Sequence, residues 1–384
     1  MILANKYRPK SFDEIIGQDH ISTILSNSIS RKKVHHAYIF CGPSGVGKTT
    51  AARVFAYSLS RLLHSQDDSS EEFGEVASRI LSDSSPDYVE IDAASNRGID
   101  EIRHLKSEIR YKPIENKYKF IVIDEAHGLT GTAAEALLKM IEEPPGHAIF
   151  ILCTTEVGKL KQTLFSRCIS LRFHKIGPLN IKKRLMLICD SEGIKIDEDA
   201  ILNIARGCDG NVRLCLQYLE TLVQSFDKDH QITLQNVSDA LNIFDKYKIS
   251  ELFDLFYNRD MGGSVLFLNN LLNSGFDAYD ILEMLVSYLR NLLICRTCKD
   301  VKSIIILSDK ERELIKKDIS RFNFNFLLES MSYLREVNEN LMHNFSPQTA
   351  YDNYILKSIL YLEHNEQKEE GKEISHKEKG KEVS

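Results

Sequence analysis

The chain has 384 residues, of which 43% are apolar and 27% are charged, and its formal net charge is −6. Its length fits about two or three globular domains, and its charge is not the strongly basic one of many DNA-binding proteins. No apolar run reaches the roughly 18 residues that a membrane-spanning helix needs. Residues 1–10 also lack the apolar stretch of a secretory signal. We therefore expect a cytoplasmic protein without a membrane segment.

The first part of the chain, up to about residue 177, alternates strand-like runs with helical patterns. Short apolar runs typical of strands buried on both faces of a parallel sheet occupy residues 36–42, 87–92, 118–124 and 147–155. Helical patterns cover Thr49–Leu63, Ile99–Ile109 and Thr132–Glu142. This alternation predicts an α/β domain with a parallel sheet.

The rest of the chain is predicted to be helical. Short amphipathic helices are expected at 180–192, 197–204 and 213–224, and further helices from about residue 246 to 364. A stripe formed by Ile281, Leu285, Leu289 and Leu292 indicates a core or a subunit interface rather than a cofactor site. Residues 365–384 are rich in Glu and Lys and almost free of apolar side chains, which predicts a disordered charged tail.

A glycine-rich turn between a predicted strand and a predicted helix fits the phosphate-binding pattern G-x-x-x-x-G-K-[ST]. Its residues, with the threonine that follows, are Gly42, Pro43, Ser44, Gly45, Val46, Gly47, Lys48, Thr49 and Thr50. The pattern predicts that Lys48 contacts the β- and γ-phosphates of ATP and that the Thr49 hydroxyl binds Mg²⁺. The alternative is a chance match in a glycine turn.

A second motif is an apolar strand, residues 120–123, that ends in Asp124 and Glu125. Asp124 is placed to hold Mg²⁺, and Glu125 to orient or deprotonate the attacking water. The alternative is a solvated strand end. Together with the glycine-rich turn, this pair predicts hydrolysis of a nucleoside triphosphate.

Further stretches resemble one family closely: residues 6–9, 12–18, 90–100 and 136–145, then Thr154 and Thr155, and finally Ser166, Arg167 and Cys168. This set resembles the gamma/tau subunits of the bacterial clamp loader, which are AAA+ ATPases. The resemblance is dense from residue 1 to about 220 and weaker beyond. It implies an AAA+ P-loop domain at 1–177, a helical lid at 178–243, a helical collar at 244–364 and the tail at 365–384.

The resemblance also implies roles for single residues. Thr155 matches the sensor of the γ-phosphate region, and Arg167 matches the arginine finger that reaches the ATP of the next subunit. Arg213 matches the second sensor, carried by the lid, and Tyr7 lies in the segment that packs near the adenine and ribose. Catalysis would then fall to Lys48, Glu125 and Arg167. The alternatives are a surface salt bridge for Arg167, an exposed helix position for Arg213 and a core position for Tyr7.

The family's activity implies an ATP- and Mg²⁺-dependent motor that opens a sliding clamp and loads it onto primed DNA during replication. Its expected partners are the delta and delta-prime subunits, the beta clamp, primer–template DNA and further copies of the chain. As part of the polymerase III holoenzyme it would rank with the DNA-directed DNA polymerases, which are nucleotidyltransferases. One alternative is a non-hydrolysing subunit resembling delta-prime. Another is a different AAA+ motor, such as a branch-migration helicase.

Two departures from the family concern metal and length. Gamma/tau proteins usually carry a four-cysteine zinc module, but residues 64–86 here contain no cysteine and are acidic and serine-rich. Cys295 and Cys298 form a lone C-x-x-C in a helical pattern. We therefore expect no zinc, free thiols, and a partly mobile segment at 64–86. The chain stops near residue 384, which resembles the shorter gamma form.

Basic residues between 99 and 112 are the candidates for DNA backbone contact, with a solvated helix face as the alternative. They are Arg103, Lys106, Arg110 and Lys112.

Overall fold

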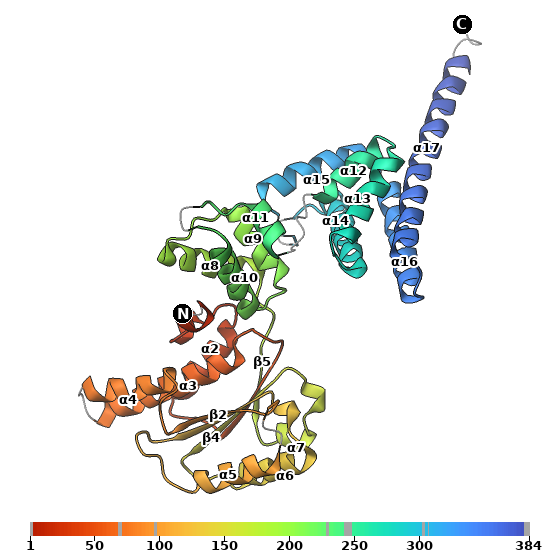
Figure 1. Cartoon of the computed structure of the whole chain (residues 1–384). Helices are drawn as coiled ribbons and strands as arrows, with labels where there is room; N and C mark the ends of the chain where they lie inside the picture. The colour runs from red at the N-terminus through yellow and green to blue at the C-terminus, as the bar shows by residue number, and fades with distance from the viewer. Residues whose placement is uncertain are drawn as a thin grey trace. The chain divides into compact units, whose positions relative to one another are not determined.

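The computed structural model describes residues 3–67, 71–95, 98–227, 230–241, 248–301, 304–305 and 307–379. Two compact units make up the chain, Met1–Leu241 and Asn242–Ser384. The first contains a sheet and helices and the second contains helices, as labelled in Figure 1. The predicted order, an α/β domain followed by helical regions, is confirmed. The expected boundary at residue 177 stays a prediction, because both of its sides belong to the first unit.

Within the described residues, five parallel strands form one sheet in the order β2-β3-β4-β1-β5. The strands are β1 (Ala37–Cys41), β2 (Tyr88–Asp92), β3 (Lys119–Asp124), β4 (Ala148–Thr154) and β5 (Ile169–Arg172). Every residue of β1 and β4 is buried, which explains their continuous apolar runs. The four predicted strands are confirmed, whereas the edge strand β5 was not predicted, because most of its residues are exposed.

Helices cover both faces of the sheet, with α5 and α6 on one face and α2, α3 and α4 on the other (Figure 1). These elements are α1 (Leu3–Lys6), α2 (Asp19–Ser30), α3 (Lys48–Asp67), α4 (Glu71–Leu81), α5 (Ile99–Ile109), α6 (Gly131–Glu142) and α7 (Gln162–Phe165), with 3₁₀ turns at Phe12–Glu14, Ala126–Gly128 and Val157–Lys159. Alternate residues of β1 serve the two faces: Ile39 joins the core under α5 and α6, and Tyr38 packs on Phe55 of α3.

The segment 64–86, expected to be partly mobile, forms the end of α3 and the helix α4. Ala77 and Ile80 of α4 are fully buried, and α4 packs against α3. These apolar side chains lie at helical spacing among acidic and serine residues. The high average polarity of the segment therefore gave no indication of a packed helix. Residues 68–70 lie outside the described part of the chain.

The first unit ends in a cluster of helices that follows the sheet. It consists of α8 (Pro178–Glu192), α9 (Glu198–Gly207), α10 (Val212–Ser225) and α11 (Leu234–Leu241). The apolar faces of these helices are buried at positions such as Ile188, Ile204 and Leu219. The three helices predicted at 180–192, 197–204 and 213–224 correspond to α8, α9 and α10.

The second unit packs its helices around one apolar core. They are α12 (Lys248–Tyr257), α13 (Met261–Asn273), α14 (Ala278–Thr297), α15 (Asp309–Arg321), α16 (Phe324–Met342) and α17 (Pro347–Lys379). The stripe of Ile281, Leu285, Leu289 and Leu292 on α14 is fully buried in this core. These residues are therefore core, which is one of the two readings that the sequence left open.

Helix α17 runs to Lys379, whereas the sequence predicted a disordered tail from residue 365. The prediction therefore differs from the structure over residues 365–379. Glu and Lys have high intrinsic helix propensity, which favours a helix over this stretch. Residues 380–384 lie outside the described part of the chain.

The eight cysteines all lie in the described ranges and are free. Across those ranges no group of three or more His, Cys, Asp or Glu side chains has the arrangement of a metal site. None of the helices that the structure describes is long and apolar enough to cross a membrane.

Candidate functional site

The glycine-rich turn connects the buried strand β1 to the N-terminus of α3. Gly42 has φ 153°, and a Cβ on it would lie 2.4 Å from the carbonyl oxygen of Phe173, so that only glycine fits. Gly47 has φ 96°, and an added Cβ would meet nothing within 4 Å, so its side of the turn is open. Helix α3 begins directly at Lys48, and its N-terminus carries the positive end of the helix dipole. An open turn ahead of a helix N-terminus is the arrangement that binds phosphate groups.

Lys48 is only 6% exposed, and its ammonium lies across the turn. Nζ donates to the carbonyl oxygens of Gly42, at 2.9 Å, and Pro43, at 2.7 Å. Burial lowers the pKa of Lys48, while the negative charges of Glu125 and Asp124 oppose that shift. Negative phosphate oxygens would also raise the pKa of Lys48 and so favour its charged form. This buried cation is therefore matched to a polyanionic ligand.

Asp124 ends strand β3 and faces the first turn of α3. Its Oδ2 accepts a hydrogen bond of 2.8 Å from Oγ1 of Thr49, and its Oδ1 accepts one of 3.0 Å from the backbone N–H of Glu125. Parallel strands end at one edge of a sheet, and β3 and β1 flank β4, which brings this carboxylate to the glycine-rich turn. A hydroxyl beside a carboxylate is a hard oxygen donor set of the kind that suits Mg²⁺. The predicted metal ligands are therefore brought together and fit the ion.

Glu125 leaves the strand in the left-handed conformation, with φ 46°. Two side chains hold its carboxylate. Oγ1 of Thr155, directly after β4, donates to Oε2 at 3.0 Å, and Nδ1 of His127, in the 3₁₀ turn Ala126–Gly128, lies 3.3 Å from the same oxygen. The other ring nitrogen of His127 lies 3.3 Å from Glu156. Thr155, predicted to face the γ-phosphate region, thus contacts the carboxylate expected to orient water. The sequence reasoning missed His127, although it follows the acidic pair closely.

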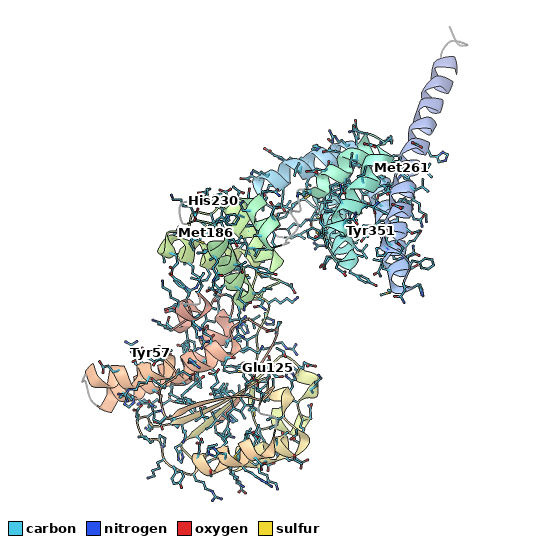
Figure 2. The ribbon with its side chains drawn as sticks, viewed as in Figure 1. Tyr57, Glu125, Met186, His230, Met261 and Tyr351 are labelled. Atoms are coloured by element: carbon cyan, nitrogen blue, oxygen red, sulfur yellow. The ribbon has the colours of Figure 1, made fainter. Side chains whose placement is uncertain are left out.

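A cavity of about 360 Å³ opens over the turn and extends to the helices that follow the sheet. Glu125, labelled in Figure 2 at the end of β3, is part of its lining. The predicted site residues in the lining are Ser44, Gly45, Val46, Gly47, Lys48, Thr49, Thr50, Asp124, Glu125, Tyr7 and Arg213. Residues distant in the sequence therefore meet at one cavity, which is large enough for a small molecule.

Tyr7 lines this cavity, and its hydroxyl is engaged by α8. The hydroxyl donates to Oε1 of Glu192 at the end of α8, and this hydrogen bond is the main cause that raises the pKa of Tyr7. Arg184 of α8 also lines the cavity and donates from Nη2 to the backbone carbonyl of Tyr7 at 2.9 Å. With the hydroxyl fixed, the ring is the part that remains for stacking on a base. Arg184 is a site residue that no sequence signal singled out.

Positive charge gathers around the cavity. Arg213 reaches it from α10, and Arg8 reaches it from the N-terminal segment. The pKa of Arg8 is lowered by burial first, and then by the charges of Arg53 and Arg213. Repulsion among neighbouring guanidinium groups is relieved when an anion lies between them. The cavity is thus electrostatically suited to phosphate groups.

The N-terminus of α10 touches the glycine-rich turn. Asn211 caps α10 by accepting a hydrogen bond of 3.0 Å from the N–H of Leu214, and Val212 N–H donates to the carbonyl oxygen of Gly45 at 3.1 Å. A Cβ on Gly45, which has φ 68°, would lie 1.7 Å from Oδ1 of Asn211. The turn and the helix that carries Arg213 are therefore in direct contact, and Asn211, like His127 and Arg184, is a residue that the sequence reasoning missed.

We expect Gly45→Ala to weaken ATP binding by about tenfold, which corresponds to about 1.4 kcal/mol, because the methyl group collides with Asn211 and φ is unfavourable for alanine. Fluorescence titration with a labelled ATP analogue measures the change. Gly146→Ala is the matched control, since a Cβ there meets nothing within 4 Å. Adding Asn211→Ala removes the collision and should recover part of the loss. Equal affinities for Gly45→Ala and the wild-type chain would contradict this contact.

Arg167 lies away from the cavity, just after α7. Its Nη2 lies 2.8 Å from Oε1 of Glu142, and its Nη1 donates to the carbonyl oxygen of Thr163 at 3.0 Å and to Oγ of Ser166 at 2.9 Å. The structure therefore does not bring Arg167 to the glycine-rich turn of its own chain. A trans role stays a prediction.

The four basic residues at 99–112 are exposed. Arg103 pairs with Asp100 at 3.1 Å, and Lys106 and Arg110 line a hollow of about 380 Å³ together with Lys139, Met140, Glu142, Glu143 and Pro145. Contact between these side chains and DNA stays a prediction. Asn96 and Arg97, from the stretch 90–100 that carries part of the family resemblance, lie outside the described residues.

Family models match two parts of the chain. A model described as DNA polymerase III, delta subunit, covers residues 17–177. A model described as RCF1/5-like, AAA+ ATPase lid domain, covers residues 183–223, which lie in α8, α9 and α10. With the parallel sheet ahead of this lid, the predicted AAA+ fold is confirmed.

Two curated relatives and one solved structure are similar to the chain. DNA polymerase III subunit tau of Bacillus subtilis is 36% identical over 302 residues, 78% of this chain and 53% of the relative. DNA polymerase III subunit gamma of Buchnera aphidicola from Acyrthosiphon pisum is 34% identical over 291 residues, 76% of this chain and 80% of the relative. The RuvB Holliday junction branch migration motor of Thermotoga maritima has a TM-score of 0.46 at 20% identity, over 65% of this chain and 78% of its own. The chain thus spans about half the length of the tau subunit and most of the gamma subunit.

Proposed function

Because the chain belongs to the family of DNA polymerase III gamma subunits, we propose that it is an ATP-hydrolysing motor subunit of a clamp loader. In this role it opens a sliding clamp and loads it onto primed DNA during replication. The observation that carries the proposal is the cavity in which Lys48, the Thr49–Asp124 pair, Glu125 and the lid residue Arg213 meet.

Binding of ATP follows from the charges and the open turn. The triphosphate lies along the turn at the N-terminus of α3, where Lys48 contacts the β- and γ-phosphates. The base and ribose lie toward Tyr7, whose hydroxyl is fixed by Glu192. Arg213 and Arg8 supply further positive charge from the lid and the N-terminal segment. Four cationic groups, Arg184 included, are matched to a ligand with about four negative charges.

Thr49 and Asp124 would hold Mg²⁺. The ion supplies positive charge against the negative charge that grows on the phosphate oxygens during phosphoryl transfer. Glu125 orients the water that attacks the γ-phosphorus and accepts its proton, while the bond between that phosphorus and the β,γ-bridging oxygen breaks. Thr155 and His127 hold the carboxylate of Glu125 in place for this task.

Completion of the site by a neighbour explains why Arg167 lies outside the cavity of its own chain. An exposed guanidinium next to α7 is available to a site on an adjoining subunit, where it neutralises charge on the transferred phosphoryl group. Hydrolysis then depends on assembly, because an isolated chain has an incomplete site.

The proposed assembly joins several copies of this chain to delta and delta-prime subunits in the cytoplasm. Support comes from large apolar side chains that stay exposed in the second unit, namely Leu266, Leu328, Met342, Leu356 and Leu360 on its helices and Phe345 between α16 and α17. The exposed basic residues of the α5 region suit the sugar–phosphate backbone of primer–template DNA. ATP binding tightens the subunit interfaces and opens the beta clamp, and hydrolysis releases clamp and DNA.

ATPase activity of the complex reconstituted with delta, delta-prime, clamp and primed DNA tests this proposal. We expect Mg²⁺-dependent hydrolysis that rises when primed DNA and clamp are added together. Failure of the chain to retain labelled ATP, alone or in the complex, would favour a non-hydrolysing subunit like delta-prime. Hydrolysis by the chain alone that moves DNA junctions without a clamp would indicate a different motor.

A further inference from the structure

Arg167 is held within its own subunit by the C-terminal end of α6. Oε1 of Glu142, the last residue of α6, lies 2.8 Å from Nη2 of Arg167. The other terminal nitrogen, Nη1, donates to Thr163 and Ser166. Both terminal nitrogens of the guanidinium are therefore engaged by acceptors of the same chain.

This ion pair is not part of the nucleotide cavity. Among the described residues that line the cavity, neither Arg167 nor Glu142 occurs. Glu142 lines the hollow between α5 and α6 instead, beside Lys106, Arg110 and Lys139. Glu142 thus contacts the guanidinium of Arg167 and also lines a hollow with basic side chains, outside the nucleotide cavity.

The ion pair between Arg167 and Glu142 is weak, so that Arg167 can exchange Glu142 for another anion. The side chains of Arg167 and Glu142 are 38% and 37% exposed, so that water and salt screen their attraction. A guanidinium makes stronger, bidentate contacts with phosphate oxygens in a site shielded from water. A neighbour's bound triphosphate would therefore displace Glu142, whereas without a neighbour Glu142 keeps Arg167.

We propose that Glu142 is a positioning residue that holds Arg167 against its own subunit until a nucleotide-loaded neighbour takes it. The inference rests on the proposed function and deepens it. Glu142 competes, within the same chain, with the nucleotide of the neighbouring subunit for Arg167. It makes hydrolysis in a loosely packed assembly slower, since Arg167 has to break one ion pair before it forms another. Removing Glu142 removes this restraint.

Glu142→Gln is the test variant, because it keeps the shape of the side chain and removes the charge. Glu143→Gln is the matched control: Glu143 is the next residue, is exposed and lines the same hollow. The first measurement is the rate at which phenylglyoxal modifies Arg167 in the full-length chain, followed by peptide mass spectrometry. We expect Glu142→Gln to raise this rate about two- to fivefold, the range that loss of an exposed ion pair allows, and Glu143→Gln to leave it unchanged.

The second measurement is hydrolysis by the reconstituted complex without DNA. We expect Glu142→Gln to raise it about two- to fivefold, and to change nothing when Arg167→Ala is also present. An unchanged modification rate, or a rise in hydrolysis that persists with Arg167→Ala, overturns the inference. Modification does not require ATPase activity, so a wild-type complex that fails to hydrolyse ATP would refute the proposed function while the reactivity of Arg167 still decides the role of Glu142.

Discussion

Arg167→Ala is expected to leave ATP binding by the isolated chain unchanged and to lower DNA-stimulated hydrolysis by the assembled complex about 10³- to 10⁵-fold. The binding residues are untouched, because Arg167 lies outside the cavity of its own chain. The loss arises in the neighbouring site, where a guanidinium no longer offsets the charge on the transferred phosphoryl group. Titration with a labelled ATP analogue and steady-state phosphate release measure the two quantities.

Arg172→Ala is a suitable control, since Arg172 is an exposed arginine on β5 close to Arg167 in sequence. Its complex should hydrolyse ATP at the wild-type rate. Normal DNA-stimulated turnover with Arg167→Ala in every copy of the chain would refute the trans role. Weaker ATP binding by the isolated Arg167→Ala chain would place this residue in its own site instead.

Lys48→Ala is expected to weaken ATP binding about 10²- to 10³-fold, because it removes a buried cation that the phosphates require. The change also removes the hydrogen bonds from Nζ to Gly42 and Pro43, so the turn loses an internal restraint. Retention of radiolabelled ATP in the presence of Mg²⁺ measures the loss. Lys33→Ala, which removes an exposed lysine after α2, is the control and should bind like the wild-type chain.

A second substitution separates loss of charge from loss of folding. Lys48→Met keeps most of the length and volume of the side chain and removes its charge, so it should fold as the wild-type chain does and still fail to retain ATP. A thermal unfolding profile shared by Lys48→Met and the wild-type chain confirms that comparison. Retained ATP in Lys48→Met would show that the phosphates are bound elsewhere.

Local sequence was enough to predict the glycine-rich turn and the acidic strand end. Gly42 and Gly47 have φ values that favour glycine, and the spacing to Lys48 and Thr49 is a property of consecutive residues. The apolar runs of β1 and β4 correctly predicted strands that are buried on both faces. The resemblance to the gamma/tau family, confirmed by the relatives, rested on such short stretches and was sufficient to predict the fold.

Segments with little apolar content were predicted poorly. Strand β5 has mostly exposed residues, and α4 carries its buried Ala77 and Ile80 within an acidic stretch. The helix over residues 365–379 differs from the disorder that their polarity indicated. Backbone pairing with β1 decided β5, packing against α3 decided α4, and helix propensity favours the helix over residues 365–379; average polarity reports none of these.

The sequence by itself determined the family to which the chain belongs, and it predicted the chemistry that we propose: a turn for phosphate groups and a pair of carboxylates for Mg²⁺ and water. Only the tertiary structure decided which side chains hold these groups. Thr155 and His127 meet Glu125, Asn211 meets Gly45, and Glu142 meets Arg167, because the ends of separate strands and helices converge in space. Contacts between residues far apart in the chain leave no local pattern, since each partner's own neighbours are compatible with many other positions.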